Sequence, residues 1–491
     1  MGCHRPAISA PSRSSTEPIP LLVGSSLNIQ LALLIVYSVA LVGLGLWISR
    51  LVRGSADFFV AGRSLGAPLL FSTVLAANIG AGTTIGAAGV GYRDGISAWW
   101  WNGAAAIGSI FLALFVGPAI WRLASKHNLY TAGDYLELRY GRSVRGIIAA
   151  LIWFGTLSIL AGQLIGGAAI LSVVAGVPRW AGIIVSAVVM TVYFMAGGLL
   201  ASAWVNAVQL AVILAGFAIA IPVALAHAGG LAAVTAAPGV PPAFNDFFYS
   251  AGARSGWTFL LLLGPAFVIS PGLLQKAYGA TSERAIRIGI GAQALVQGLF
   301  AFLPPLLGMI GRATHPGLND LNVVLPTVLI EQLPVALGGL ALAAVYSAEV
   351  STCDAILFML ATSLSQDLYK RFLKPSASDA ELLRVARAAS VAGGIGGVLL
   401  ALRLPTVIDA LAIFYTLLGV SLFVPVVGGL YTRRAGTPEA LASIAAGIGG
   451  ALTMRWLPHP VRWWLDPGVV GLAAAASAFM LMFAFRRPRR A

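Results

Sequence analysis

The stretch that decides the fold runs from Gly66 to Gly91 and reads GAPLLFSTVLAANIGAGTTIGAAGVG. It is apolar and long enough to cross a bilayer core of about 30 Å, which takes roughly 20 residues of helix. Its middle, from Ala76 to Thr84 (AANIGAGTT), is small, polar and rich in glycine. The pattern predicts a membrane-spanning helix that is interrupted near its centre. A simple packing kink is the alternative, because glycines are common where membrane helices touch closely.

The composition of the whole chain is that of a membrane protein. Of its 491 residues, 58% are hydrophobic and only 10% are charged, whereas soluble domains carry roughly 25% charged residues. This deficit excludes a soluble enzyme, a nucleic-acid-binding protein and a disordered scaffold. We therefore interpret the net charge of +14 as an orientation signal in short loops.

Apolar runs of bilayer length predict an all-α polytopic membrane protein with about thirteen transmembrane helices. We divide the chain into a disordered N-terminal tail (1–27), an extra N-terminal helix (28–48), two five-helix repeats (66–226 and 256–430), and two C-terminal helices with a basic tail (438–491). The expected spans lie near 28–48, 66–91, 98–121, 145–174, 179–197, 203–226, 256–275, 286–311, 335–365, 384–402, 406–430, 438–455 and 466–485.

A second interrupted span opens the second block. It carries Gly264-Pro265 and then Ser270-Pro271-Gly272, and each proline removes a backbone donor and clashes with the preceding turn. Paired interruptions at corresponding positions of two halves are typical of inverted-repeat transporters, whose binding site lies at the broken helices. We therefore predict a five-plus-five inverted repeat with two broken helices, although no residue-by-residue similarity joins the halves.

Lysines and arginines alternate between the loops in a way that sets orientation. Placing the C-terminal RRPRRA in the cytoplasm puts most of them, including Lys126, Arg139 and Lys370, in inside loops. We expect the N-terminus outside and the C-terminus in the cytoplasm of a bacterial-type inner membrane. We also expect a monomer, although the sequence carries no direct sign of the oligomeric state.

The ninth span carries polar groups at helical spacing. Ala348, Ser351 and Thr352 stand at i, i+3 and i+4, on one face of a helix. If the interruption near Ala76–Ile79 lies opposite them, its freed carbonyls and the two hydroxyls form a cage of neutral oxygens suited to sodium. The alternative is that the hydroxyls bond back to carbonyls of their own helix.

The same span holds two carboxylic acids, Glu349 and Asp354. Each charge at mid-membrane costs about 2.5–3.5 kcal/mol on insertion scales, and a purely structural helix has no need of that cost. We interpret at least one acid as part of an ion or proton pathway. The alternatives are a protonated Glu349 bonded to a neighbouring helix, or a carboxylate nearer the surface.

Four separated motifs resemble the sodium:solute symporter family. They are FFVAGRSLG (58–66), TAGDYLELRYG (131–141), AGGLLASAWVNAVQ (196–209) and SLSQDLYKRF (363–372). Each is weak alone, but all four occur in order and at matching spacing, and the resemblance covers about residues 28–434. It implies a leucine-transporter-type fold and a symporter that imports a small organic solute by alternating access, with Na⁺ as the coupling ion.

The resemblance also implies where sodium binds. Its ligands fall by position on the backbone of Ala76 and Ile79, the carbonyl of Ala348, and the hydroxyls of Ser351 and Thr352. These are the residues that the two polar segments had already indicated.

One departure from the family pattern concerns a second ion. The W-T-D motif, whose carboxylate helps a second sodium site in some members, reads Trp204-Val205-Asn206 here, and Asp354 stands where the family usually has a small residue. We hypothesise that the acid has moved across the helix interface, so that Asp354 and Asn206 face each other. With Glu349 they are the candidates for a second cation or proton site. The alternative is an Asn–Asp hydrogen bond without an ion.

Polar positions on spans that line the family's central cavity are candidate substrate contacts, with interhelical hydrogen bonding as the alternative. They are Asn78, Thr83, Gln163 and Tyr415. Lysine and arginine are absent from the mid-membrane stretches assigned to the cavity, which disfavours a fixed cation for carboxylate solutes. The sequence does not identify the solute.

The main rival is a proton-coupled symporter of the same fold that uses Glu349 and Asp354. A channel would need a continuous polar lining, and the five histidines lie in the tail, loops or span ends, without a catalytic or metal-binding motif. We therefore expect a transporter and not an enzyme. Its expected partners are a small solute, sodium and the lipid bilayer, without nucleic acid.

Overall fold

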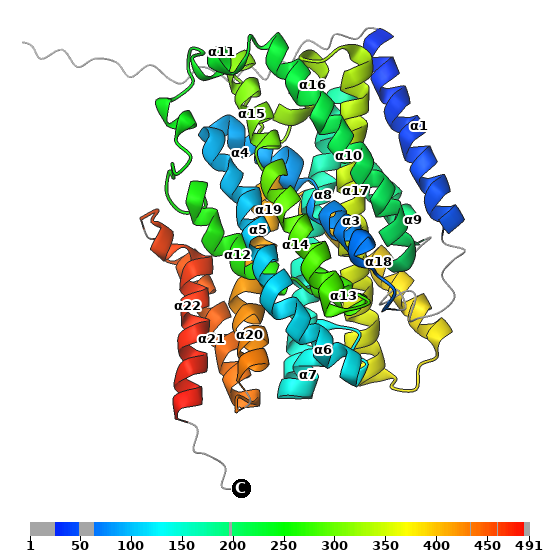
Figure 1. Cartoon of the computed structure of the whole chain (residues 1–491), viewed down its shortest axis with the longest axis vertical. Coiled ribbons are helices and arrows are strands. Elements are labelled where there is room, and N and C mark those ends of the chain that lie inside the picture. Colours follow the sequence, from blue (N-terminus) through cyan, green and yellow to red (C-terminus); the bar gives the residue numbers. More distant parts are fainter. Residues whose placement is uncertain (1–24, 49–62, 196–198, 433, 459, 486–491) are drawn as a thin grey trace, which may run out of the picture.

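The described part of the chain is a bundle of helices that run mostly from one end of the molecule to the other (Figure 1). The computed structural model describes residues 25–48, 63–195, 199–432, 434–458 and 460–485. The start of α1 (Ser25–Ile48) and the end of α22 (Pro467–Ala484) lie at opposite ends of the bundle. Most of the predicted tail at 1–27 and the basic C-terminal tail lie outside the described residues.

The helices have the length and composition expected of a membrane protein. Within the described residues, nine helical segments are long and apolar enough to cross a membrane, and three shorter apolar helices accompany them. The predicted all-α polytopic membrane protein is therefore confirmed. The count of thirteen spans and the division into two repeats stay predictions.

The first half of the chain contains α1 and eight further helices before a long loop. These are α3 (Ala67–Asn78), α4 (Ala87–Asp94), α5 (Trp99–Phe111), α6 (Gly117–His127), α7 (Ala132–Tyr140), α8 (Arg142–Ala175), α9 (Arg179–Met195) and α10 (Leu199–His227). The second half ends in α22 and begins with the short α11. Before α22 it contains α11 (Leu231–Thr235), α12 (Phe259–Ile269), α13 (Pro271–Tyr278), α14 (Glu283–Phe300), α15 (Leu303–Thr314), α16 (Val324–Glu331), α17 (Val335–Thr362), α18 (Asp379–Ala401), α19 (Val407–Leu418), α20 (Val424–Tyr431) and α21 (Thr437–Trp456).

The first predicted interruption is present. Helix α3 ends at Asn78, and Ile79 leaves helical geometry with φ −93° and ψ 93°. The chain becomes helical again at Gly82, in a short π-helical segment (Gly82–Gly86) that leads into α4. Because an interrupted helix leaves its last carbonyls without partners in the next turn, the break exposes oxygen atoms at mid-span.

The second interruption is also present, at only one of its two predicted prolines. Ser270 (φ −51°, ψ 122°) separates α12 from α13, and Pro271 opens α13, where its missing N–H removes no helical hydrogen bond. Pro265 instead lies inside α12, so the Gly264-Pro265 pair does not break the helix. Membrane helices tolerate such a proline because neighbouring groups satisfy the freed backbone.

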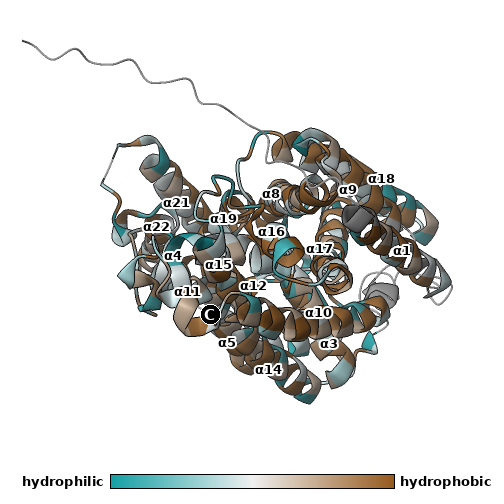
Figure 2. Ribbon diagram, turned by 90° about the horizontal axis from the view of Figure 1, so that it is seen from above, coloured by the Kyte–Doolittle hydropathy of each residue, from teal (hydrophilic) through white to brown (hydrophobic). Residues whose placement is uncertain are grey.

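Helix α17 forms the centre of the bundle. It contacts α8, α10 and α16, and in the view from above it lies among them, with α21 and α22 toward one edge and α1 and α18 toward the other (Figure 2). It continues without a break into a π-helical segment (Ser363–Leu373), which makes one rod from Val335 to Leu373.

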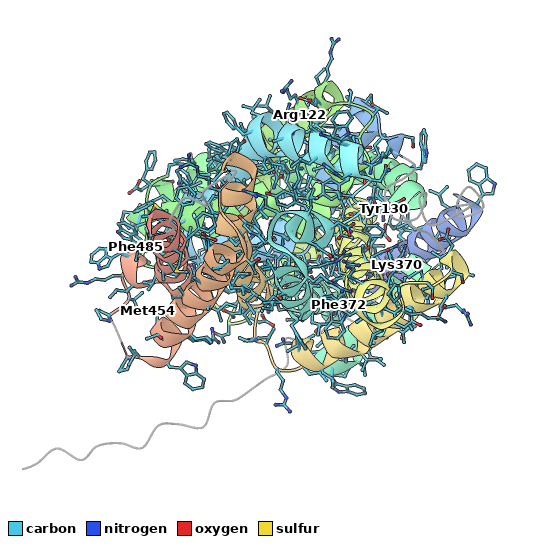
Figure 3. The ribbon with its side chains drawn as sticks, turned by 90° about the horizontal axis from the view of Figure 1, so that it is seen from below. Arg122, Tyr130, Lys370, Phe372, Met454 and Phe485 are labelled. Carbon is cyan, nitrogen blue, oxygen red and sulfur yellow. The ribbon has the colours of Figure 1, made fainter. Side chains whose placement is uncertain are left out.

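The end of the bundle where α22 finishes carries basic side chains. Seen from below, this face includes Arg122 and Lys370 (Figure 3). Arg122 lies in α6 and Lys370 in the π-helical extension of α17. Segments distant in sequence therefore bring positive charge to the same end.

Candidate functional site

The interruption after α3 lies directly against α17. The Ser351 hydroxyl donates to the carbonyl of Ala76, with 2.9 Å between the oxygens. The Thr352 hydroxyl lies 3.1 Å from the Ala77 carbonyl and 3.4 Å from that of Ala76. Ala76, Ile79 and Ser351 are completely buried. The structure thus brings together the two segments that the sequence analysis paired.

Carbonyl and hydroxyl oxygens converge at this contact. Ser351 Oγ lies 2.9 Å from the carbonyl of Ala348 on its own helix as well as 2.9 Å from that of Ala76. Because a hydroxyl carries one hydrogen, it donates fully to one of these carbonyls at a time. Back-bonding within α17 therefore occurs, but it coexists with the contact across to the interruption.

Close approach of the two segments depends on a glycine. A Cβ at Gly80 would lie 2.5 Å from Thr352 Oγ1 and 2.8 Å from Gln163 Oε1. The flexible Gln163 side chain could move aside, but Thr352, whose Cβ would lie 2.7 Å away, or the backbone at Gly80 would have to shift. Gly80 therefore allows the interrupted backbone to reach the hydroxyl groups of α17.

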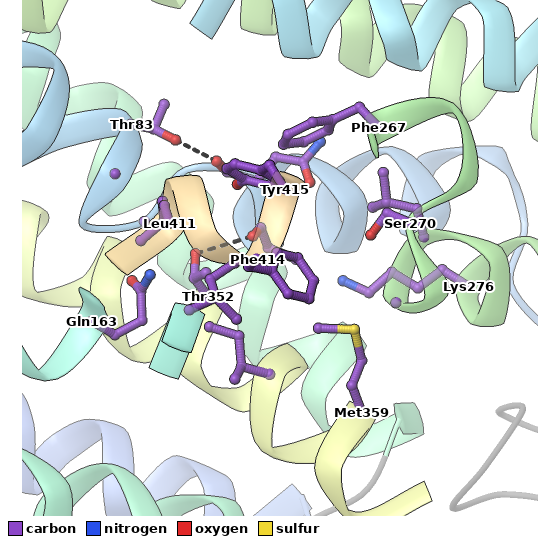
Figure 4. A pocket seen from close by; sticks show the side chains of 18 residues that line it. Thr83, Gln163, Phe267, Ser270, Lys276, Thr352, Met359, Leu411, Phe414 and Tyr415 are labelled. Carbon is purple, nitrogen blue, oxygen red and sulfur yellow. Dashed lines mark hydrogen bonds between the residues drawn. The ribbon is translucent and has the colours of Figure 1, made fainter. Parts of the chain in front are cut away.

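The four candidate substrate residues line one pocket beside this contact (Figure 4). They are Asn78, Thr83, Gln163 and Tyr415, and Thr352 lines the pocket too. The cavity has a volume of about 50 Å³, whereas sites for small molecules usually measure about 300–1,000 Å³. Side chains must therefore move before a small organic solute can occupy it.

Three of these residues also hold the interruption in place. The Thr83 hydroxyl donates to the Asn78 carbonyl at 2.6 Å, the amide oxygen of Gln163 accepts from the Ala81 N–H at 2.9 Å, and Asn78 Nδ2 donates to Gln297 Oε1 at 3.1 Å. The fourth, Tyr415, packs its ring against Phe267. Hydrogen bonding between helices, which was the alternative to substrate contact for these residues, thus occurs within the pocket.

The two acids proposed for a second cation or proton site lie on different faces of α17. Asp354 interacts electrostatically with Lys276 of α13. Glu349 faces α8, since a Cβ at Gly166 would lie 2.8 Å from its Oε1. Five residues along a helix correspond to a rotation of about 140°. Asn206 of α10 is buried and donates to Thr73 Oγ1 at 3.3 Å.

Lys276 is a pocket residue that the sequence analysis missed. Its side chain is buried and lines the pocket, and its Nζ donates to the Thr73 carbonyl at 2.6 Å. The expectation that the cavity contains no lysine is therefore wrong, because the predicted span ended one residue too early. Pro271 could have indicated this lysine from the sequence. A helix that restarts at Pro271 places Lys276 only about 7.5 Å further along the helix axis.

A charge network joins α7, α8 and the π-helical end of α17. Arg145 pairs with Asp134 at 2.8 Å, Glu137 at 2.9 Å and Asp367 at 2.8 Å, and Arg371 also pairs with Glu137. Partial burial alone raises the pKa of Glu137, but hydrogen bonds from Arg371 and Arg145 outweigh it and lower that pKa. We call these five residues the cytoplasmic-end network, after the side predicted for them.

Two interrupted helices around a central pocket, with neutral oxygens beside it, define a secondary transporter. The chain belongs to the sodium:solute symporter family, which it matches over residues 58–447. The family consists of transporters, and this chain is a multi-pass membrane protein that couples sodium to the symport of a small solute. Sodium is the coupling ion, and the proton-coupled alternative is not favoured.

Similar proteins cover nearly the whole chain. The sodium/glucose cotransporter of Vibrio parahaemolyticus is 26% identical, with 88% of this chain and 86% of the relative aligned. The sodium/pantothenate symporter of Escherichia coli K12 is 28% identical, with 87% and 92% aligned. The structure of a Na⁺-coupled sialic acid symporter in a substrate-bound outward-open state matches with a TM-score of 0.80 and 19% identity, covering 94% of this chain and 98% of that one. The last likeness establishes the fold.

Proposed function

We propose that this symporter imports a small organic solute by alternating access and holds one Na⁺ between the interruption after α3 and the middle of α17. The proposed ligands are the carbonyls of Ala76, Ile79 and Ala348 and the hydroxyls of Ser351 and Thr352. The observation that carries the proposal is the contact of Ser351 and Thr352 with the carbonyls at the break.

The chemistry of these groups fits a monovalent cation. Carbonyl and hydroxyl oxygens are hard, neutral ligands, and unwound backbone carbonyls serve as sodium ligands in transporters with broken helices. Divalent ions such as Ca²⁺ are generally held with carboxylates. Glu349 is not a ligand of the proposed ion site, because its carboxyl group packs against Gly166 of α8.

Sodium and solute are coupled through shared residues. Thr352 contacts the interruption and also lines the pocket. A sodium ion that draws the break onto α17 therefore shapes the pocket, which is positive coupling between two sites. One charge crossing 100 mV supplies about 2.3 kcal/mol, and a tenfold sodium gradient adds about 1.4 kcal/mol. One sodium ion thus suffices for about 500-fold accumulation of a neutral solute.

One sodium ion is our proposal for the stoichiometry. The hypothesis of a second cation at Asp354 and Asn206 loses support from the position of Lys276. Its ammonium group already interacts with Asp354, and a cation bound to the same carboxylate would be repelled by that ammonium group in a low-dielectric interior.

The orientation follows from the distribution of positive charge. Arg122 and Lys370 lie at the end where α22 finishes (Figure 3), and cytoplasmic loops are the ones enriched in lysine and arginine. We propose that this end faces the cytoplasm of a bacterial-type inner membrane, with the N-terminus outside. We further propose that the two five-helix repeats move relative to each other and that the protein works as a monomer.

The test compares hydroxyl groups on one helix. We expect purified wild-type protein to melt at a higher temperature in sodium than in potassium at equal ionic strength. Ser351→Ala or Thr352→Ala should weaken sodium binding by about 10- to 150-fold, since an interaction with a charged group contributes about 1.5–3 kcal/mol. Thr362→Ala is the matched control, because Thr362 donates only to Phe358 of its own helix.

Two results would contradict the sodium site. The first is a wild-type protein whose melting temperature does not distinguish sodium from potassium. The second is an equal loss of the sodium effect in Thr362→Ala and Ser351→Ala.

A further inference from the structure

Lys276 brings a positive charge to the wall of the central pocket. It lies in α13, six residues after Ser270 at the second interruption, and its side chain is buried. Figure 4 shows it extending from α13 toward Phe414 and Met359. The ammonium group is therefore part of the pocket, at the level of the broken helices.

The hydrogen-bonding capacity of this ammonium exceeds what the protein supplies. An ammonium group has three donors, and Nζ of Lys276 has one acceptor among the described residues, the Thr73 carbonyl at 2.6 Å. Two donors remain for the contents of the pocket. A buried donor without an acceptor costs free energy, so a ligand that accepts from these donors gains affinity.

The balance of charge favours an anionic ligand. Asp354 supplies one negative charge near Lys276. The proposed sodium ligands are neutral, so a bound sodium ion adds a positive charge that its own ligands do not cancel. Sodium and Lys276 together carry two positive charges against the one of Asp354. A carboxylate on the solute removes this excess from a low-dielectric interior, where it is costly.

The rest of the pocket suits an apolar body with a few polar contacts. Its lining includes Phe267, Met359, Leu411, Phe414 and Tyr415 as apolar or aromatic side chains. Small-molecule sites combine such a lining with a few well-placed polar groups that fix orientation. The polar groups here are those of Asn78, Gln163 and Lys276.

We propose that Lys276 binds the carboxylate of the solute, and that the solute is a small organic monocarboxylate with an apolar body. This inference rests on the proposed sodium-coupled import, and it assigns the chemical class of the solute and one residue that recognises it. Sodium and the carboxylate then enter together and approximately neutralise each other. Transport of one sodium ion with one such anion moves no net charge, so only the concentration gradient of sodium drives it. A tenfold gradient then supports about tenfold accumulation, in place of the larger figure for a neutral solute.

The experiment uses acids paired with their neutral amides. Purified full-length protein is melted in sodium with benzoate or benzamide, lactate or lactamide, and pyruvate or pyruvamide. We expect at least one acid, and not its amide, to stabilise the wild-type protein. Lys276→Met should weaken that binding by about tenfold or more, because hydrogen bonds between charged groups are stronger than those between neutral groups, and Lys276→Arg should keep part of it.

Controls separate this inference from the proposal on which it rests. Sodium alone should still raise the melting temperature of Lys276→Met, which shows that the variant folds and keeps its sodium site. Lys374→Met should bind like the wild type, because Lys374 is half exposed and pairs with Glu381. If sodium stabilises neither the wild type nor Lys276→Met, the sodium-coupled function itself has failed.

Several outcomes would overturn the role of Lys276 while sodium binding persists. They are a panel in which no acid stabilises the wild type, amides that bind as well as acids, and unchanged acid binding by Lys276→Met. A fourth is a sodium Hill slope that rises from one toward two in Lys276→Met. That slope would show that the ammonium replaces a second sodium ion instead of binding the solute.

Discussion

Two regions of the same rod, Val335–Leu373, use opposite chemistry. Around Ser351 and Thr352 the contacts to the neighbouring segment are made by neutral oxygens. Around Asp367, about 22 Å further along, the contacts belong to the cytoplasmic-end network of Arg145 and its carboxylates. Neutral oxygens bind an ion reversibly, whereas paired charges hold protein segments together. The difference indicates where the protein exchanges a ligand and where it maintains its own structure.

Breaking the charged region should have the largest effect. Arg145→Met leaves the nearly buried Asp367 and its neighbours without their cation, and removing one partner of a buried ion pair costs about 3–5 kcal/mol. We expect a large fall in melting temperature, measured in detergent without sodium. Arg122→Met removes an exposed pair with Glu283, for which about 1 kcal/mol or less is expected. Equal falls in the two variants would contradict a structural role for the network.

The neutral region should respond to a smaller steric change. Gly80→Ala places a methyl group 2.5 Å from Thr352 Oγ1, and overpacking of this kind costs about 1–3 kcal/mol. We expect weaker sodium binding together with modest destabilisation. The control is Gly291→Ala in α14, where a Cβ meets nothing within 4 Å. Unchanged sodium binding by Gly80→Ala would separate the interruption from the ion site.

Acid should weaken the charged region, and this is the smallest of the three expected effects. The pKa of Glu137 is lower in the folded protein than its ordinary value. Its stabilising contribution is therefore complete above the ordinary glutamate pKa and is lost as the pH falls through the lower pKa of the folded state. Melting temperatures in sodium-free buffer should fall less steeply with acid for Glu137→Gln than for the wild type. Parallel curves would show that Glu137 contributes nothing.

The sequence predicted what depends on local chemistry. Two glycines and two threonines weaken the helix within AANIGAGTT, and Pro271 begins a helix more readily than it continues one. Both breaks lie in these stretches. Pro265 shows the limit, because whether a proline interrupts a membrane helix depends on neighbours that satisfy the freed backbone.

Other features depend on contacts that no local pattern reveals. Arg145 and Asp367 are 222 residues apart in sequence, and nothing near either of them indicates the other. Glu349 and Asp354 were candidates for one cation or proton site, yet α8 packs against the first and α13 lies near the second. The roles of Ala76, Ile79, Ala348, Ser351 and Thr352 as sodium ligands stay a prediction, with geometry that fits it.

The uninterrupted rod from Val335 to Leu373 connects the level of the proposed ion site to the cytoplasmic-end network. A tilt of about 10° over the roughly 22 Å between Thr352 and Asp367 displaces the far end by about 4 Å. That movement exceeds the 2.8 Å separation between Arg145 and Asp367. We therefore expect a small tilt of the rod at the level of the proposed ion site to strain the Arg145–Asp367 contact at the far end of the same rod.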